Sequence, residues 1–317
     1  MLNRRYLRIK TFQSLYAYWQ SDNTSAARIE KDLFTGIERT YDLYLSLLLI
    51  FGELRHVAEL VFEERKKKRL PTPEDLNPNR KFVDNPVVLA IVQSERLRLE
   101  CEKRKISWVG HHELFTALYR EVQNNEEVKA YMNATEASTF KRDQAFVVSL
   151  FSDLIANSEA VQEVYENRSI AWMEDLDLAA SLVKRTLEQM RATDAPDAFM
   201  NEVSREPQED HDFASMLFRK TIQYAEEHEK AISAKSSNWE SDRIALSDMI
   251  LMQMALTEVR VFDQIPVKVT MNEYIEIAKA YSTPKSKNFI NGVLDKLFIE
   301  MRSEGRIRKV GRGLLES

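Results

Sequence analysis

The sequence predicts an all-α fold, and three observations support this prediction. Glycine, which is unfavourable inside helices, occurs only seven times in 317 residues. Apolar residues recur at helical spacing along nearly the whole chain, and no alternating segment is long enough to favour a strand. The composition, 44% hydrophobic and 30% charged, is that of a water-soluble globular protein. The length allows two compact units, or one domain with a large insertion.

The first predicted helix ends at residues 22–25, which are polar. Its apolar stripe follows the spacing i, i+3, i+4, i+7 and consists of Phe12, Leu15, Tyr16 and Trp19. A second helix is expected over residues 26–35, and a third runs from near Gly36 to about Phe62. A basic run, residues 65–69, follows this helix. Its composition fits either a nucleic-acid contact or the solvated, cation-favouring end of a helix.

A proline-rich segment then interrupts the helical pattern. Four of the eight prolines lie here, at Pro71, Pro73, Pro78 and Pro86. Clustered prolines break helices, so this segment is predicted to be a linker or an irregular region. The pattern is helical again from Pro86 to about Arg205.

The middle of the chain contains an internal repeat. Residues 146–175 align without gaps onto residues 213–242. The identical pairs are Phe146/Phe213, Leu150/Leu217, Phe151/Phe218, Ile155/Ile222, Glu159/Glu226, Ser169/Ser236, Trp172/Trp239 and Asp175/Asp242. Each copy is predicted to form an amphipathic helix, a polar corner that contains the tryptophan, and a second helix, which indicates a duplicated helical hairpin.

The last hundred residues predict three more helices. Residues 242–259 are apolar nearly all round, so their helix is expected to be central. Pro266 marks a turn, after which Thr270 and Glu273 have the spacing of a capping box that would start the next helix.

The final helix is expected to begin at Thr283, its N-cap, with Pro284 in the first helical position. It would bury part of an apolar set that runs from Phe289 to Met301, and Gly305 would close it.

Charge is distributed unevenly along the chain. Residues 1–20 hold four cations and no acid, and residues 284–317 hold eight cations against four acids, although the whole chain has a net charge of −5. Two basic ends on an acidic body indicate a local site for a polyanion, because phosphate binding depends on a local patch. The alternative is that these ends are simply solvated.

The sequence shows no chemistry of an enzyme, a metal site or a cofactor site. The single cysteine, Cys101, excludes an internal disulfide and favours a reducing compartment. The longest apolar run, Leu43–Phe51, is too short to span a membrane, and the N-terminus lacks a secretory h-region, so a cytoplasmic protein is expected. The residues His111, His112 and His228 lack metal-ligand spacing, and no glycine-rich phosphate loop occurs.

The N-terminal helix is the best candidate for a binding site. Arg4, Arg5 and Arg8 supply cations for phosphates, and Tyr16 and Tyr18 supply aromatic faces two turns later. Single-stranded nucleic acid is bound by this combination of cations and stacking rings. The alternative is that Tyr16 belongs to the core, because it shares the apolar stripe of its helix.

Two parts of the chain resemble the NusB family of bacterial transcription antitermination factors. The first is Arg4–Gln20, with its arginines followed by QSLYAYWQ. The second follows the family pattern in order and spacing through residues 248–258 (DMILMQMALTE), 265–269 (IPVKV), 272–279 and 289–296 (FINGVLDK). Together these motifs specify several consecutive helices and the turns between them.

The resemblance implies a helical bundle of two subdomains without enzymatic activity. It also implies binding of the boxA element of ribosomal RNA leader transcripts, together with NusE, a ribosomal small-subunit protein. By position, the RNA-binding residues would be Arg4, Arg5, Arg8, Tyr16, Lys285, Lys287, Phe289 and Asn291. Asp248 would face NusE. Where the family often has an acid, Lys285 is basic, which suggests a phosphate contact.

The resemblance divides the chain into three parts. Residues 1–60 and 208–317 would form the NusB-like framework, and residues 61–207 would be an extra helical region that includes the first hairpin copy. A protein–protein scaffold that uses the acidic middle and has lost its RNA site is the alternative function. An RNA methyltransferase is disfavoured, because no catalytic domain or glycine-rich loop is present.

Overall fold

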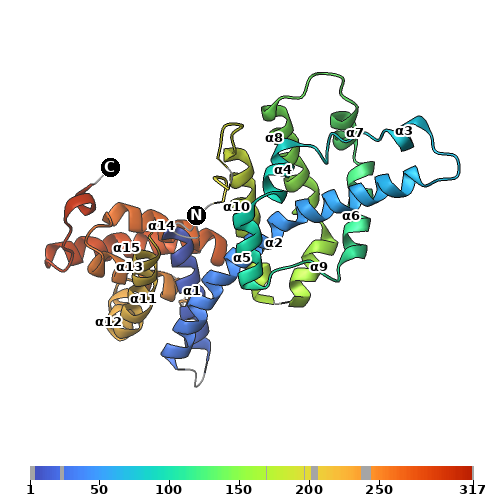
Figure 1. The fold of residues 1–317 in the computed structure, drawn as a ribbon. Helices are drawn as coiled ribbons and strands as arrows, with labels where there is room; N and C mark the ends of the chain where they lie inside the picture. The colour runs from blue at the N-terminus through green and yellow to red at the C-terminus, as the bar shows by residue number, and fades with distance from the viewer. Residues whose placement is uncertain are drawn as a thin grey trace. The chain divides into compact units, whose positions relative to one another are not determined.

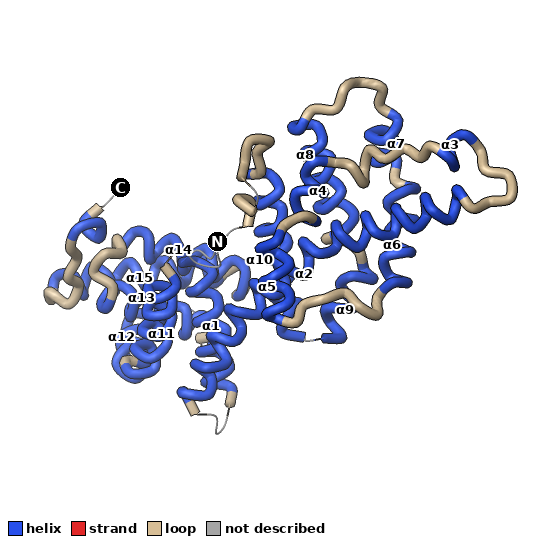
Figure 2. The backbone as a smooth tube through the Cα atoms, viewed as in Figure 1, coloured by secondary structure: helices blue, strands red, loops and turns tan. Residues whose placement is uncertain are grey.

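The computed structural model of the chain describes residues 4–21, 25–168, 170–195, 197–200, 206–236 and 244–315. Among these residues the backbone forms helices and loops and no strand (Figure 2), which confirms the predicted all-α class. The chain divides into two compact units. One consists of residues 38–203, and the other combines residues 2–37 with residues 204–317. In Figure 1 the residues of each unit can be recognised by their colour, which runs from blue at the N-terminus to red at the C-terminus.

The prediction of separate second and third helices is wrong. Residues Ala26–Lys66 form one helix, α2, which continues through Gly36. A glycine costs a helix only about 1 kcal/mol, which the buried neighbours Leu33, Ile37 and Tyr41 offset. The division between the two units falls within this helix, between Ile37 and Glu38.

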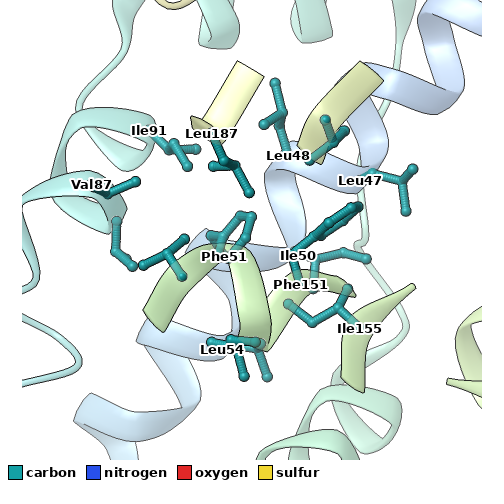
Figure 3. Close-up of a cluster of buried hydrophobic side chains, with 14 of the residues drawn as sticks. Leu47, Leu48, Ile50, Phe51, Leu54, Val87, Ile91, Phe151, Ile155 and Leu187 are labelled. Atoms are coloured by element: carbon teal, nitrogen blue, oxygen red, sulfur yellow. The ribbon is translucent and has the colours of Figure 1, made fainter. Parts of the chain in front are cut away.

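The unit of residues 38–203 is built around the second part of α2. Its other helices are α3 (Pro73–Leu76), α4 (Pro86–Val92), α5 (Glu95–Arg104), α6 (His112–Asn124), α7 (Glu126–Asn133), α8 (Phe140–Ser149), α9 (Glu159–Arg168) and α10 (Ile170–Gln189), with a π-helical turn η1 (Leu150–Ile155) after α8. Leu47, Phe51 and Leu54 of α2 meet Phe151 and Ile155 of η1 in the core (Figure 3).

Polar groups of α2 that enter this core all find partners. The Thr40 hydroxyl donates to Asp175 at 3.0 Å, and the Tyr44 hydroxyl lies 3.0 Å from that of Thr186. The indole N–H of Trp108 donates to the Ser46 carbonyl oxygen at 2.9 Å. Unpaired buried polar groups are costly, so these bonds fix how the surrounding helices pack on α2.

The proline-rich segment is irregular, as predicted, but it contains the short helix α3 and ends at α4. Thr72 and Asp75 form a reciprocal capping box at the start of α3. Asn85 caps α4 through its side-chain oxygen, which accepts from the N–H groups of Val87 and Val88, and Pro86 takes the first helical position.

The two hairpin copies bury equivalent residues in the two units. Phe146, Leu150 and Phe151 are buried in one, and Phe213, Leu217 and Phe218 are buried in the other. The structure divides the predicted first helix of the second copy into α11 (Pro207–Gln223) and α12 (Ala225–Ser236). Ser169, the side chain of Trp172, Trp239 and Asp242 lie outside the described part of the chain.

The unit of residues 2–37 and 204–317 is organised around α13 (Leu246–Val261). Around it lie α1 (Arg4–Gln20), α11, α12, α14 (Val267–Tyr281) and α15 (Ser286–Ser303), and a 3-10 turn η2 (Gly311–Leu314) ends the described chain. Helix α13 is buried on all sides from Ile250 to Val259 and contacts each of α1, α11, α12, α14 and α15. This confirms the prediction of a central helix.

The predicted helix starts in this unit are wrong in detail. Helix α14 begins directly after Pro266, three residues before Thr270, without a side-chain cap. Helix α15 begins at Ser286, two residues after Pro284. Gly305 adopts a φ of 68° after α15, as expected for the residue that closes a helix. None of the described helices has the length and apolar character of a membrane span.

Candidate nucleic-acid interface

One face of α1 lies along α14. Arg5, Phe12 and Tyr16 share this face because steps of seven and eleven residues return almost to the same angle on a helix. Near the start of α1, Arg5 forms two hydrogen bonds of 2.8 Å with Glu273 of α14. Further along, the Phe12 and Tyr281 rings lie 5.5 Å apart. These side-chain contacts define a line between the two helices, the α1–α14 seam, along which residue numbers increase in the same direction in both helices.

Arg8 does not lie on the surface, contrary to its predicted role in RNA binding. Its side chain is only 3% exposed, and it forms two hydrogen bonds of 2.7 and 2.8 Å with the fully buried Glu258 of α13. Burial alone lowers the pKa of the Arg8 guanidinium, but the Glu258 carboxylate raises it above the usual arginine value. Arg8 therefore serves to attach α1 to the core.

Glu258 joins three helices. Besides Arg8, it accepts hydrogen bonds from the hydroxyls of Thr270, at 2.7 Å, and Tyr274, at 3.1 Å, both on α14. Burial raises the pKa of the Tyr274 hydroxyl well above its usual value, so this hydroxyl stays a donor. A buried carboxylate needs such a complete set of donors. Thr270 and Glu273, predicted to form a helix cap, instead bind Glu258 and Arg5.

Arg4 and Arg5 reach the surface but are paired. Arg4 lies 3.5 Å from Asp210, donates to the Glu209 carbonyl oxygen at 3.2 Å and covers the ring of Phe213 at 4.6 Å. The Arg5 side chain is 46% exposed, and its hydrogen bonds hold the pKa of the Glu273 carboxyl below its usual value. A phosphate would have to share either guanidinium with these acids.

Tyr16 offers an aromatic face to solvent. The residue is 39% exposed and does not belong to the core, although it shares the apolar stripe of α1. Its ring lies 6.3 Å from that of Phe12, which in turn contacts Tyr281, itself 37% exposed. Two partly exposed tyrosines thus flank Phe12 at one end of the α1–α14 seam. Tyr281 is not among the residues predicted to bind RNA.

The first turn of α15 follows Tyr281 within a few residues. Lys285, Lys287 and Asn291 are exposed, and no ion pair or hydrogen bond engages their side chains within the described part of the chain. Phe289, by contrast, is only 9% exposed and its ring faces the core, which leaves little surface for a base. The free cations of this region are therefore Lys285 and Lys287, in contrast to the paired arginines of α1.

Asp248, predicted to face a protein partner, is 6% exposed. Its two carboxylate oxygens accept hydrogen bonds from the hydroxyls of Ser282 and Ser286, the latter at 2.8 Å. These bonds tie the start of α13 to the turn between α14 and α15. Asp248 thus supports the loop that presents Lys285.

The basic run after α2 is partly neutralised. Lys66 pairs with Glu63 at 2.8 Å, and Lys68 pairs with Asp75 at 2.9 Å. This pattern fits a solvated helix end better than a nucleic-acid contact. No group of three or more potential metal ligands is found in the described ranges.

The sequence indicated the exposed lysines of α15 but not the buried acid that pairs with Arg8. Glu258 appeared as one acid in an apolar helix, and an acid on an otherwise fully buried helix was the available signal of a buried ion pair. Tyr281 was recognisable only once its distance from Phe12 was known.

Comparison with known proteins identifies relatives of this chain. The NusB family model matches residues 173–298, which run from α10 to α15. The transcription antitermination protein NusB of Salinibacter ruber is 47% identical over 104 residues, which cover 33% of this chain and 65% of that protein. NusB of Chloroherpeton thalassium is 42% identical over 105 residues, or 33% of this chain and 50% of that protein.

A third relative is covered more completely. NusB of Geobacter sulfurreducens is 38% identical over 93 residues, which are 29% of this chain and 67% of that protein. The chain thus spans one half to two thirds of the length of these relatives. No solved structure is significantly similar to it.

Proposed function

Because the chain belongs to the NusB family, we propose that it is an RNA-binding transcription antitermination factor. It binds boxA-type single-stranded RNA of ribosomal leader transcripts and acts with NusE in the elongation complex in the cytoplasm. The observation that carries this proposal is the exposed Tyr16 ring at one end of the α1–α14 seam, where α15 starts with two unpaired lysines. Rings that stack on bases and cations that contact phosphates are the two parts of a single-strand site.

The arrangement assigns different tasks to the predicted residues. Tyr16 stacks on a base, Lys285 and Lys287 contact phosphates, and Asn291 offers an amide for hydrogen bonding. Arg8 and Asp248 hold helices in place and do not touch RNA. Phe289 holds the start of α15 against the core, because most of its ring is buried.

Fluorescence anisotropy with a labelled boxA-type RNA, with and without NusE, tests the proposal. Tyr16→Ala is expected to weaken RNA binding by about 1–3 kcal/mol, the usual value of one base stack, whereas Tyr16→Phe retains most of the affinity. Binding of neither RNA nor NusE at low salt would contradict the proposal.

A salt titration tests the lysines separately. Each phosphate contact adds about 0.7 to the slope of log affinity against log salt for single strands, so Lys285→Gln and Lys287→Gln should each reduce the slope by about that amount. Lys230→Gln is the matched control, since Lys230 is exposed on α12 of the same unit and lies on another helix. An equal effect of all three substitutions would indicate unspecific charge attraction.

A further inference from the structure

The start of α1 borders a cavity that the family resemblance does not explain. It encloses about 930 Å³ and is formed by α1, α11, the turn between α13 and α14, and the end of the chain after α15. This last segment follows residue 298, where the match to the family model stops. Volumes of this size are usual for ligand sites.

The end of the chain is held against the cavity by specific contacts. The Val310 N–H donates to the Asp263 carbonyl oxygen at 3.1 Å, and the Lys309 ammonium donates to the Phe262 carbonyl oxygen at 2.7 Å. Gly313 packs so closely that a β-carbon would lie 1.9 Å from the Asp263 oxygen. These contacts fix the position of Arg312 at the cavity.

Arg312 is the cation of the cavity that is not already paired. It is exposed and forms no ion pair with any described residue. The other three arginines that line the cavity are paired: Arg4 with Glu209, Arg5 with Glu273 and Arg8 with Glu258. A free guanidinium is suited to bind a phosphate through two parallel hydrogen bonds.

The walls of the cavity suit a nucleobase. The rings of Phe213 and Phe262 lie 4.8 Å apart, and Arg4 covers Phe213. Met216 adds an apolar side chain that is 43% exposed. Unstacked bases are held between such apolar and guanidinium surfaces in proteins that bind single-stranded RNA.

The cavity is also aligned with the proposed RNA site. Arg5, at its edge, and Tyr16 lie on the same face of α1, eleven residues or about 16 Å apart along the helix. A single strand that stacks on Tyr16 and follows the α1–α14 seam therefore reaches the cavity after a few nucleotides.

We propose that this cavity, completed by Arg312 from the end of the chain, binds a second nucleotide of the same RNA strand, outside the segment held by Tyr16 and Lys285. This inference rests on the proposed function and extends it. The nucleotide places its base against Phe262 and Met216 and its phosphate on Arg312.

Binding of a short and a long RNA tests the inference. The short RNA carries only the boxA-type core, and the long RNAs extend it by a few nucleotides at either end. Arg312→Gln should weaken binding of one long RNA by roughly 3- to 10-fold, as expected for one lost hydrogen-bonded contact, and leave the short RNA unchanged. Arg308→Gln is the control, because Arg308 is an exposed cation on the same segment that does not line the cavity.

The outcomes separate this inference from the proposed function. If Tyr16→Ala weakens both RNAs while Arg312→Gln weakens neither, the second nucleotide site is refuted and the RNA-binding function stands. Equal effects of Arg312→Gln and Arg308→Gln also refute it. If Arg312→Gln weakens binding of NusE and not of RNA, the cavity holds a protein segment and the inference is wrong. Absence of any RNA binding by the unaltered protein refutes both.

Discussion

Two arginines of α1 with the same hydrogen-bond geometry should differ strongly in their effect on stability. Arg8 and Arg5 each form a bidentate pair with a glutamate at 2.7–2.8 Å, but the Arg8 side chain is 3% exposed and the Arg5 side chain 46%. Arg8→Met leaves the buried Glu258 charge with two hydroxyl donors only. Removal of one partner from a buried pair costs about 3–5 kcal/mol, whereas an exposed pair contributes about 0–1 kcal/mol.

Hydrogen exchange of the α13 amides is the appropriate assay. It reports the opening free energy of the unit that contains α1 and α13, independently of the other unit. Arg8→Met should lower this free energy by about 3–5 kcal/mol and Arg5→Met by less than about 1 kcal/mol. The double substitution Arg8→Met with Glu258→Met should recover much of the loss, because no charge is then left buried. Equal effects of Arg8→Met and Arg5→Met would refute the reasoning.

Two further predictions concern buried groups of the same unit. Burial lowers the pKa of His228 to about 4, so the unfolded chain binds the proton more readily and stability falls as the pH drops from 6.5 towards 4. The free energy of unfolding of the unaltered protein, measured by urea unfolding and compared with that of His228→Gln, should fall by about 3 kcal/mol between pH 6.5 and pH 4. If the difference between the two proteins is the same at both pH values, the assignment of His228 is contradicted. Gly313→Ala should release the end of the chain, because its β-carbon would overlap the Asp263 oxygen. Hydrogen exchange at Val310 should then accelerate, whereas Leu314→Ala, at an exposed position, should leave it unchanged.

The helical elements were largely predictable because apolar spacing reports which side chains can be buried together. The spacing of Thr270 and Glu273 shows the limit of this reasoning. The pair has the form of a capping box, yet both side chains leave their own backbone to bind Glu258 and Arg5. Their partners lie on other helices, Glu258 at a separation of 12 residues from Thr270 and Arg5 at a separation of 268 residues from Glu273. The residues next to Thr270 and Glu273 in the sequence contain no information about either partner.

The candidate site was predictable in composition but not in the roles of its residues. The arginines of α1 look equivalent in the sequence, since all three follow one another on a basic helix. The structure separates them by angle around the helix axis: Arg5 faces the edge of α14, and Arg8 faces Glu258 of α13. Lys285 and Lys287 form no ion pair among the described residues, because the acid that reaches the first turn of α15, Asp248, accepts hydrogen bonds from the hydroxyls of Ser282 and Ser286 instead.

The sequence by itself determined the helical class, the central position of residues 250–259 and the relation to the NusB family, since each follows from periodicity or residue identity. Only the tertiary structure decided that residues 26–66 form one helix that belongs to two units, and which cations are free to bind a phosphate. The physical reason is that burial and pairing depend on contacts between distant segments. Arg8 lies next to the buried Glu258 carboxylate and is part of the core, whereas Arg5, three positions earlier, is part of the surface.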